Sequence, residues 1–348
     1  EETTGSVGGN IGYSDFGLML GFNLREQNFL GSGNTVGIGI NKNIYSEMYN
    51  LSFMNPYATK DGVSLGYNVY FRETDYGEFN VANYLTNSNG FGAQFGYPTS
   101  DITRLGFNVT YDKTDIDVGT LPALEIYDFV SAEGNIFETL SVQFSWQRVT
   151  LNRGLFPTAG SSTVISLSTT VPGSDLSYHR SSIRQRYYRP LSSNFVFGFS
   201  GELGYLDAYG DTKETPFFQN FYAGGPRSLR GFESNTLGPR STDAPCYEFN
   251  YEDKTCPNLI DTDGDGELDS PYINPYAGST SRYRDRPIGG NIKVEGSMQL
   301  IFKLPFIEDQ RSLRSAFFFD FGNVFSDNCK DYQINCYKPA LEDLRYSY

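Results

Sequence analysis

Apolar and polar residues alternate along most of this chain with a period of two. In residues 141–147, SVQFSWQ, the second, fourth and sixth side chains are apolar and the others are polar. The same alternation recurs in residues 64–72, 107–112 and 195–203. Because successive side chains of a strand point to opposite faces, each run predicts a strand with one apolar and one polar face. Such runs predict about fourteen strands, and no helical period of useful length is found.

Two all-β architectures produce this alternation. A soluble sandwich packs its apolar faces against each other, whereas a transmembrane barrel turns them to lipid and encloses a polar, watery lumen. Aromatic residues lie near the predicted strand ends, and the polar faces carry Asn, Gln and Arg. These features favour an all-β fold of the antiparallel transmembrane β-barrel type, whose closure leaves no unpaired edge in lipid.

Charge and cysteine usage narrow the function classes. The formal net charge of −14 argues against nucleic acid as a partner, because its phosphates need a basic surface. None of the four cysteines has Cys-x-x-Cys spacing, so we expect neither zinc binding nor thiol redox chemistry. Among the three connectivities, the two local pairs Cys246–Cys256 and Cys329–Cys336 are favoured. Disulfides would place the chain in an oxidising compartment such as the periplasm or cell surface.

The connections between predicted strands fall into two length classes. Short turns, such as residues 189–194, alternate with longer polar segments, of which residues 224–287 form the longest. Outer-membrane barrels have short periplasmic turns and long outer loops, so residues 224–287 are expected on the outer side. That loop opens with GGPRSLRGFES, residues 224–234, in which a Gly-Gly-Pro turn precedes an isolated Arg230 and an aromatic Phe232.

Five segments resemble the BamA family in the order that the family shows. They are NFLGSGNTVGIGINK (28–42), NPYATKDGVSLGYNVYF (55–71), RGLFPTAGSS (153–162), GGPRSLRGF with ESNTLGPR (224–240) and FFFDFGNVF (317–325). BamA proteins are the barrel subunits of the bacterial outer-membrane assembly machinery, within a wider superfamily of insertases and secretion translocators. The resemblance covers essentially the whole chain. It implies a barrel of roughly 16 strands in the intact family, with the large extracellular loop folded into the lumen like a plug.

The resemblance also implies how this loop is held. The family's loop motif matches Leu229, Arg230, Gly231 and Phe232, and its arginine makes a charged contact with an inner-wall acid that matches Asp320. Asp320 lies between two phenylalanines, so alternation turns it toward the lumen. An arginine there can form a bidentate, charge-assisted pair, and the Gly-Gly-Pro turn would let the chain reverse inside the barrel.

A second wall position departs from the family. Where close relatives carry a glutamate, this chain has Gln299, which has no charge. Two alternatives remain for this position. Either Glu295, four residues earlier and on the same face, takes the place of the glutamate, or Gln299 itself hydrogen-bonds the guanidinium.

The chain ends and the predicted first strand need separate interpretation. Relatives continue past RYSY with two more strands and begin with periplasmic repeat domains, so residues 1–348 are expected to form one barrel domain without these parts.

The first strand, GSVGGNIGY, carries four glycines that weaken its pairing: Gly5, Gly8, Gly9 and Gly12. Two compatible interpretations are room on the lumen side for an inserted segment, and a lateral seam closed by one of the missing strands.

Residues 261–269, DTDGDGELD, carry the clearest ion-binding pattern. Oxygen ligands at alternate positions and a glycine at the sixth match calcium loops, but the twelfth position lacks the bidentate carboxylate. The alternatives are a calcium site that stiffens an outer loop and a merely acidic, solvated loop. The candidate ligands are Asp261, Asp263, Asp265, Glu267 and Asp269.

The single histidine, His179, lies in an alternating strand without the serine elbow of a hydrolase. Polar packing is therefore favoured over catalysis, and we expect a protein that is not an enzyme and requires no cofactor.

Two function classes remain. The first is an outer-membrane assembly factor that helps β-barrel clients fold and insert through a weak seam at the first strand. Its partners would be unfolded clients, periplasmic or lipoprotein accessory subunits, and the lipid bilayer. The alternative is a polypeptide-secretion pore of the two-partner type, which would open when the loop withdraws. Both share the loop motif, while the glycine-rich first strand favours the assembly factor, and both predict the bacterial outer membrane.

Overall fold

The described strands form one antiparallel sheet in which each strand pairs with its neighbours in sequence. The computed structural model describes residues 4–14, 17–77, 81–82, 84–119, 122–244, 250–254, 286–304, 314–333 and 335–348. The strand order runs from β1 to β14 without a crossover, and the predicted all-β class and strand number are confirmed. β1 and β14 form the two edges and are not paired with each other within these residues.

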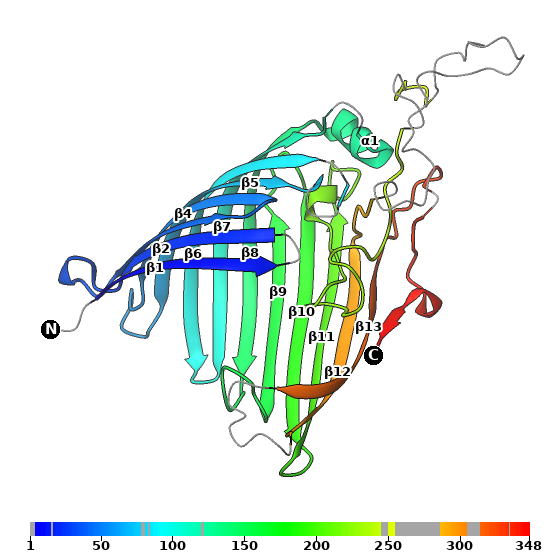
Figure 1. The fold of residues 1–348 in the computed structure, drawn as a ribbon. Helices are drawn as coiled ribbons and strands as arrows, with labels where there is room; N and C mark the ends of the chain where they lie inside the picture. The colour runs from blue at the N-terminus through cyan, green and yellow to red at the C-terminus, as the bar shows by residue number, and fades with distance from the viewer. Residues whose placement is uncertain are drawn as a thin grey trace, which may run out of the picture.

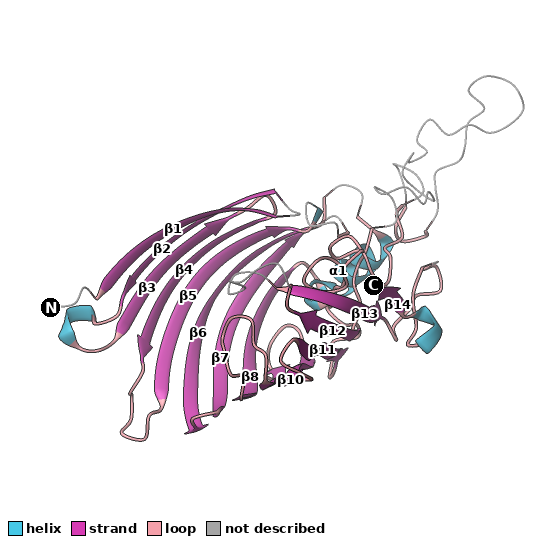
Figure 2. Cartoon of the chain, turned by 60° about the horizontal axis from the view of Figure 1, so that its bottom comes forward, coloured by secondary structure: helices cyan, strands magenta, loops and turns pink. Residues whose placement is uncertain are grey.

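Figure 1 shows the strands side by side in one strongly curved sheet, and Figure 2 shows the curvature from a second direction. In chain order the strands are β1 (Gly5–Ser14), β2 (Gly17–Glu26), β3 (Thr35–Lys42), β4 (Ser46–Asn55), β5 (Ser64–Asp75), β6 (Leu85–Ser100), β7 (Thr103–Asp117), β8 (Ile136–Val149), β9 (Gly160–Thr170), β10 (Tyr178–Pro190), β11 (Phe195–Ala208), β12 (Ile292–Phe302), β13 (Ser315–Phe325) and β14 (Arg345–Ser347). The helices are α1 (Leu124–Glu133) and the short 3-10 turns η1 (Phe29–Gly31), η3 (Phe217–Gln219) and η4 (Leu341–Asp343).

The two faces of the sheet differ as the alternation predicts. On β8, Leu140 and Phe144 are exposed on the outer face. Between them Gln143 points inward, where its Oε1 accepts a hydrogen bond of 3.2 Å from Nδ2 of Asn108 on β7. An apolar outer face and a polar, self-bonded inner face are what a lipid-facing barrel wall requires.

The connections differ in length between the two ends of the sheet, which we call the turn end and the loop end. At the turn end, residues 191–194 join β10 to β11. At the loop end, residues 209–291 join β11 to β12, so this connection is longer at both ends than the predicted 224–287. The predicted loop was too short because residues 209–223 are rich in aromatic residues, like the preceding strand.

The α-helix α1 contradicts the expectation that no helix of useful length is present. It lies at the loop end between β7 and β8 (Figure 1). Ala123 provides no side-chain cap at its start, and Gly134, with φ of 97°, ends it. A helix of ten residues without a capping side chain leaves too weak a pattern in the sequence for helical periodicity or capping rules to identify it. Among the described residues, no helix is both long and apolar enough to span a bilayer.

Buried apolar side chains gather at the loop end rather than between two layers of sheet. One cluster joins α1 to the long connection through Ile126, Phe129 and Phe217. In the described ranges no hydrophobic side chain before Val81 is buried. The apolar faces of the strands are therefore not packed against a second sheet, which excludes the sandwich.

Candidate functional site

The connection after β11 turns back onto the inner wall at Gly224 and Gly225. Their φ angles are 106° and 99°, a region that residues with a side chain rarely adopt. The N–H of Gly225 lies 3.1 Å from the carbonyl oxygens of both Leu229 and Phe232, which closes a tight turn. The Gly-Gly-Pro turn thus reverses the chain and directs Arg230 at β12 and β13.

Arg230 forms a multiply bonded ion pair with Asp320 of β13. Its Nη2 lies 2.6 Å from Oδ1, its Nε 2.7 Å from Oδ2, and its backbone N–H donates to Oδ2 at 3.1 Å. The Asp320 side chain is fully buried. The guanidinium also stacks on Phe318, with Cζ 3.6 Å from the ring centroid. A lysine could reproduce neither the forked pair nor the stacking.

The second wall partner of Arg230 is a serine that the sequence interpretation missed. Nη2 of Arg230 donates to Oγ of Ser297 at 3.0 Å. Nε2 of Gln299 donates to the same hydroxyl at 3.4 Å, and among the described residues Gln299 is not hydrogen-bonded to the Arg230 guanidinium. Ser297 is the register partner of Asp320 across β12 and β13, on the same face as Gln299. Alternation combined with register could therefore have identified it.

Glu295 holds the loop through a different residue from the one expected. Its Oε2 accepts a hydrogen bond of 2.9 Å from the hydroxyl of Ser228, not from Arg230. Lys293 lies 2.9 Å from Glu295 and 3.3 Å from Glu202, and Glu202 lies 2.9 Å from Arg184. Charges of opposite sign thus alternate along the inner wall from β10 to the loop turn.

The remaining motif residues pack the loop against the wall. Leu229 is completely buried in a cluster with Phe221 and Val324, and Phe232 packs on the same cluster. Gly231 has a φ of 84°, and a Cβ there would lie 2.8 Å from Oγ of Ser347 in β14. The motif therefore combines a buried ion pair, an apolar plug and one close backbone approach. This arrangement holds the loop against the inner wall.

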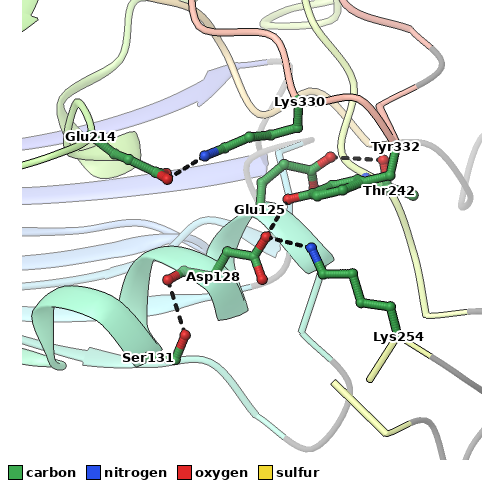
Figure 3. Close-up of polar contacts among 8 residues, drawn as sticks. All are labelled: Glu125, Asp128, Ser131, Glu214, Thr242, Lys254, Lys330 and Tyr332. Atoms are coloured by element: carbon green, nitrogen blue, oxygen red, sulfur yellow. Dashed lines mark hydrogen bonds and ion pairs between the residues drawn. The ribbon is translucent and has the colours of Figure 1, made fainter. Parts of the chain in front are cut away.

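A second group of contacts joins the outer connections to one another (Figure 3). Asp128 of α1 accepts hydrogen bonds from Oη of Tyr332 at 2.7 Å and from Nζ of Lys254 at 2.9 Å. Tyr332 lies in the short loop closed by the Cys329–Cys336 disulfide, which confirms that predicted pair. Burial, with the hydrogen bond to Asp128, raises the pKa of the Tyr332 hydroxyl.

Two further contacts complete this group, which we call the loop clasp. Lys330, in the same disulfide loop, forms an ion pair with Glu214. Glu125 at the start of α1 accepts bonds from the backbone N–H and the hydroxyl of Thr242 at 2.9 and 2.7 Å. Burial raises the pKa of Glu125 to about 7, although the bonds from Thr242 act in the opposite direction. The clasp ties α1, the long connection and the disulfide loop together.

The four glycines of the predicted seam lie in β1. A Cβ added to Gly8 would meet no atom within 4 Å, and one added to Gly9 would meet only the carbonyl oxygen of Gly21 at 4.0 Å. The neighbouring side chains of Val7 and Ile11 are 70% and 79% exposed. Packing therefore does not explain the glycines at positions 8 and 9, whereas a Cβ at Gly5 or Gly12 would lie 2.9 Å from Oε2 of Glu26 or 3.3 Å from Cε of Met19.

Several predicted residues cannot be placed. The calcium candidates Asp261 to Asp269 and the pair Cys246–Cys256 lie outside the described residues. Within the described ranges, no three His, Cys, Asp or Glu side chains form a metal-binding group. His179 lies on the outer face of β10, with its ring centroid 5.9 Å from that of Tyr205.

One family model matches most of this chain. The model of the Omp85 superfamily domain matches residues 28–348. The chain belongs to the Omp85 superfamily. Its fold is accordingly the antiparallel transmembrane β-barrel of that superfamily, of which fourteen strands are present here.

Individual relatives match between 68% and 95% of this chain. The outer membrane protein assembly factor BamA of Neisseria meningitidis serogroup B is 29% identical in an alignment over 342 residues that covers 95% of this chain and 38% of the relative. The mouse sorting and assembly machinery component 50 homolog is 24% identical over 68% of this chain and 49% of its own length.

A crystal structure of BamA from Haemophilus ducreyi lacking POTRA domains 1–3 is similar in three dimensions. Its TM-score is 0.78 at 29% identity, over 94% of this chain and 58% of that one. This Omp85 chain thus spans less than two thirds of the length of each of these relatives.

Proposed function

We propose that this chain is the barrel of a bacterial outer-membrane protein assembly factor, which helps other β-barrel proteins fold and insert into the membrane. The chain lies in the bacterial outer membrane. The observation that carries the proposal is the likeness to BamA proteins over at least 94% of the chain, in sequence and in fold.

The proposed mechanism works through backbone pairing at β1. An unpaired backbone group in lipid costs several kcal/mol, which opposes insertion of an unfolded strand. A seam beside β1 that opens would offer its N–H and C=O groups to an incoming strand, which would pair by edge addition. The unpacked inner face at Gly8 supports such a movable strand. Such a mechanism has no reaction centre, so we propose neither an enzymatic activity nor a required cofactor.

The rigid side of the barrel supports the same mechanism. Arg230 and Asp320 hold the loop against β12 and β13, so the lumen stays filled while the opposite edge moves. The proposed partners are unfolded β-barrel clients, periplasmic or lipoprotein accessory subunits, and the lipid bilayer. These partners rest on the relatives being named assembly factors and assembly machinery components.

Calcium binding by residues 261–269 is a separate proposal that rests on the sequence pattern. A calcium titration of the intact protein tests it, because extracellular calcium modules bind at up to about 1 mM. The absence of binding in that range would reject calcium and leave an acidic outer loop.

A reconstitution experiment tests the function. The intact protein in liposomes receives an unfolded barrel client, and the client's folding rate is measured together with leakage of a small dye, with empty liposomes as the control. Faster client folding without matching leakage supports the assembly factor. Leakage or polypeptide passage without faster folding would reject it in favour of the secretion pore.

A further inference from the structure

A polar cavity of about 500 Å³ lies inside the barrel, between the inner wall and the long connection. Serine and threonine side chains from β5 through β10 form most of its wall, and Gln219 of the connection lies at its rim. The charged side chains that line it are three arginines, Arg72, Arg180 and Arg184, and one acid, Asp112. The cavity is therefore positive within a chain whose net charge is −14.

The acid that lines this cavity, Asp112, and the nearby Glu202 already have partners. Asp112 accepts hydrogen bonds from the hydroxyl of Tyr70 and, at 2.6 Å, from that of Thr114. Glu202 pairs with Arg184 at 2.9 Å and with Lys293 at 3.3 Å. Neither acid is hydrogen-bonded to Arg72 or Arg180.

Two of these arginines, Arg180 and Arg72, contact aromatic rings and form no ion pair among the described residues. The Nε of Arg180 is buried and has no hydrogen-bond partner among the described residues. Its guanidinium lies over the ring of Phe221, with Cζ 4.2 Å from the ring centroid. Arg72 contacts the ring of Tyr70 at 5.5 Å and forms no ion pair with the described part of the chain. Both side chains line the same cavity, from β5 and from β10.

A buried guanidinium nitrogen without a hydrogen-bond partner, such as Nε of Arg180, is unfavourable. The planar fork of arginine matches the oxygens of phosphate, and hydroxyl groups supply further donors. We propose that this cavity binds a phosphate-type oxyanion, as the free ion or a monoester, with Arg180 and the hydroxyl wall as its ligands and Arg72 as the second positive charge.

The bound anion would also hold the long connection. Phe221 lies under the Arg180 guanidinium and Gln219 lines the cavity, so an anion at Arg180 ties the start of the connection to β10. This contact is separate from the Arg230 anchor, which holds the later part of the same connection against β12 and β13.

Calorimetric titration of the intact, folded protein with inorganic phosphate and with glycerol 1-phosphate tests the proposal. The test variant is Arg180→Gln. Arg186→Gln is the matched control, because Arg186 lies on the same strand and face, outside the cavity, and its replacement changes the net charge equally. We expect saturable binding by the wild type and the control, and binding about tenfold or more weaker in Arg180→Gln.

Binding of both probes identifies a site open to monoesters, and binding of phosphate alone identifies a site for the free ion. Either result supports the proposal. If Arg180→Gln fails to fold, Arg72→Gln serves as the second variant, with the same loss expected in direction. Absence of saturation at concentrations well above about 1 mM, or equal binding by the cavity variants and the control, overturns the proposal.

Discussion

The two sides of this barrel are fixed to very different degrees. From β5 to β13 the wall carries the loop anchor, the loop clasp and all the buried hydrophobic side chains of the described residues. From β1 to β4 none of the described hydrophobic side chains is buried, and the inner face of β1 has open space at Gly8. An assembly factor that opens beside β1 needs this division, since one side must move while the other keeps the lumen filled.

The largest expected effect comes from breaking the anchored side at Arg230. Arg230→Ala leaves Asp320 as a buried, unpaired charge and should lower the free energy of unfolding by about 3–5 kcal/mol, with loss of assembly activity. Denaturant unfolding of the folded barrel measures it. Arg227→Ala is the control, because Arg227 is an exposed arginine in the same turn and should cost no more than about 0.5 kcal/mol. Equal, small losses in both variants would remove the anchoring role.

Raising the pH should weaken the loop clasp at Glu125. The pKa of about 7 in the folded protein is above the ordinary value of 4.5, so the stabilisation by the protonated carboxyl is fully present below pH 4.5 and is lost as the pH rises from 4.5 through 7. The loss is on the order of 3 kcal/mol. As the pH rises, hydrogen exchange of the α1 amides should accelerate more in the wild type than in Glu125→Gln. Comparing the two proteins at each pH cancels the intrinsic exchange rates. Parallel profiles would contradict this role.

Removing the disulfide should loosen another part of the clasp. Replacing Cys329 and Cys336 by serine opens this short loop and should lower the free energy of unfolding of the loop by about 2–3 kcal/mol. Lys330, paired with Glu214, should then be acylated faster, whereas the exposed Lys338 serves as the internal control. An unchanged ratio of the two labelling rates would show that the clasp holds without the disulfide.

The smallest expected effects are changes in stability of opposite sign on the two sides of the barrel. At Gly8 a Cβ meets nothing, so Gly8→Ala should strengthen β1 by about 0.5–1 kcal/mol and slow client folding if the seam must open. At Gly296 of β12 a Cβ would lie 2.3 Å from the Phe321 ring, so Gly296→Ala should destabilise by about 1–3 kcal/mol. Equal signs in unfolding experiments would contradict the division between the sides.

Local alternation was enough to predict the strands, because lipid on one side and the lumen on the other impose a period of two. It placed Phe144 outside and Asp320 inside correctly. The α1 helix escaped detection, since Leu124 and Ile126 are buried by contacts with distant loops rather than by a helical stripe.

The site was predictable as far as the family resemblance and alternation reached. Arg230 and Asp320 lie together in the structure, and Phe318 lies two residues before Asp320 on the same face of β13. Ser297, in contrast, depends on the register between β12 and β13. That register is a long-range property and cannot be read from one strand. Arg180 had no sequence signal either, because only the folded structure shows that its Nε is buried without a hydrogen-bond partner among the described residues.

The most direct test of the central claim is site-specific photo-crosslinking during client folding. A photoreactive residue replaces Asn10 in β1 or, as the control, Asn68 in β5, which is paired on both sides. The account predicts crosslinks to the folding client from position 10 and none above background from position 68. Equal crosslinking at the two positions, or accelerated folding with no crosslink at position 10, would contradict a seam at β1.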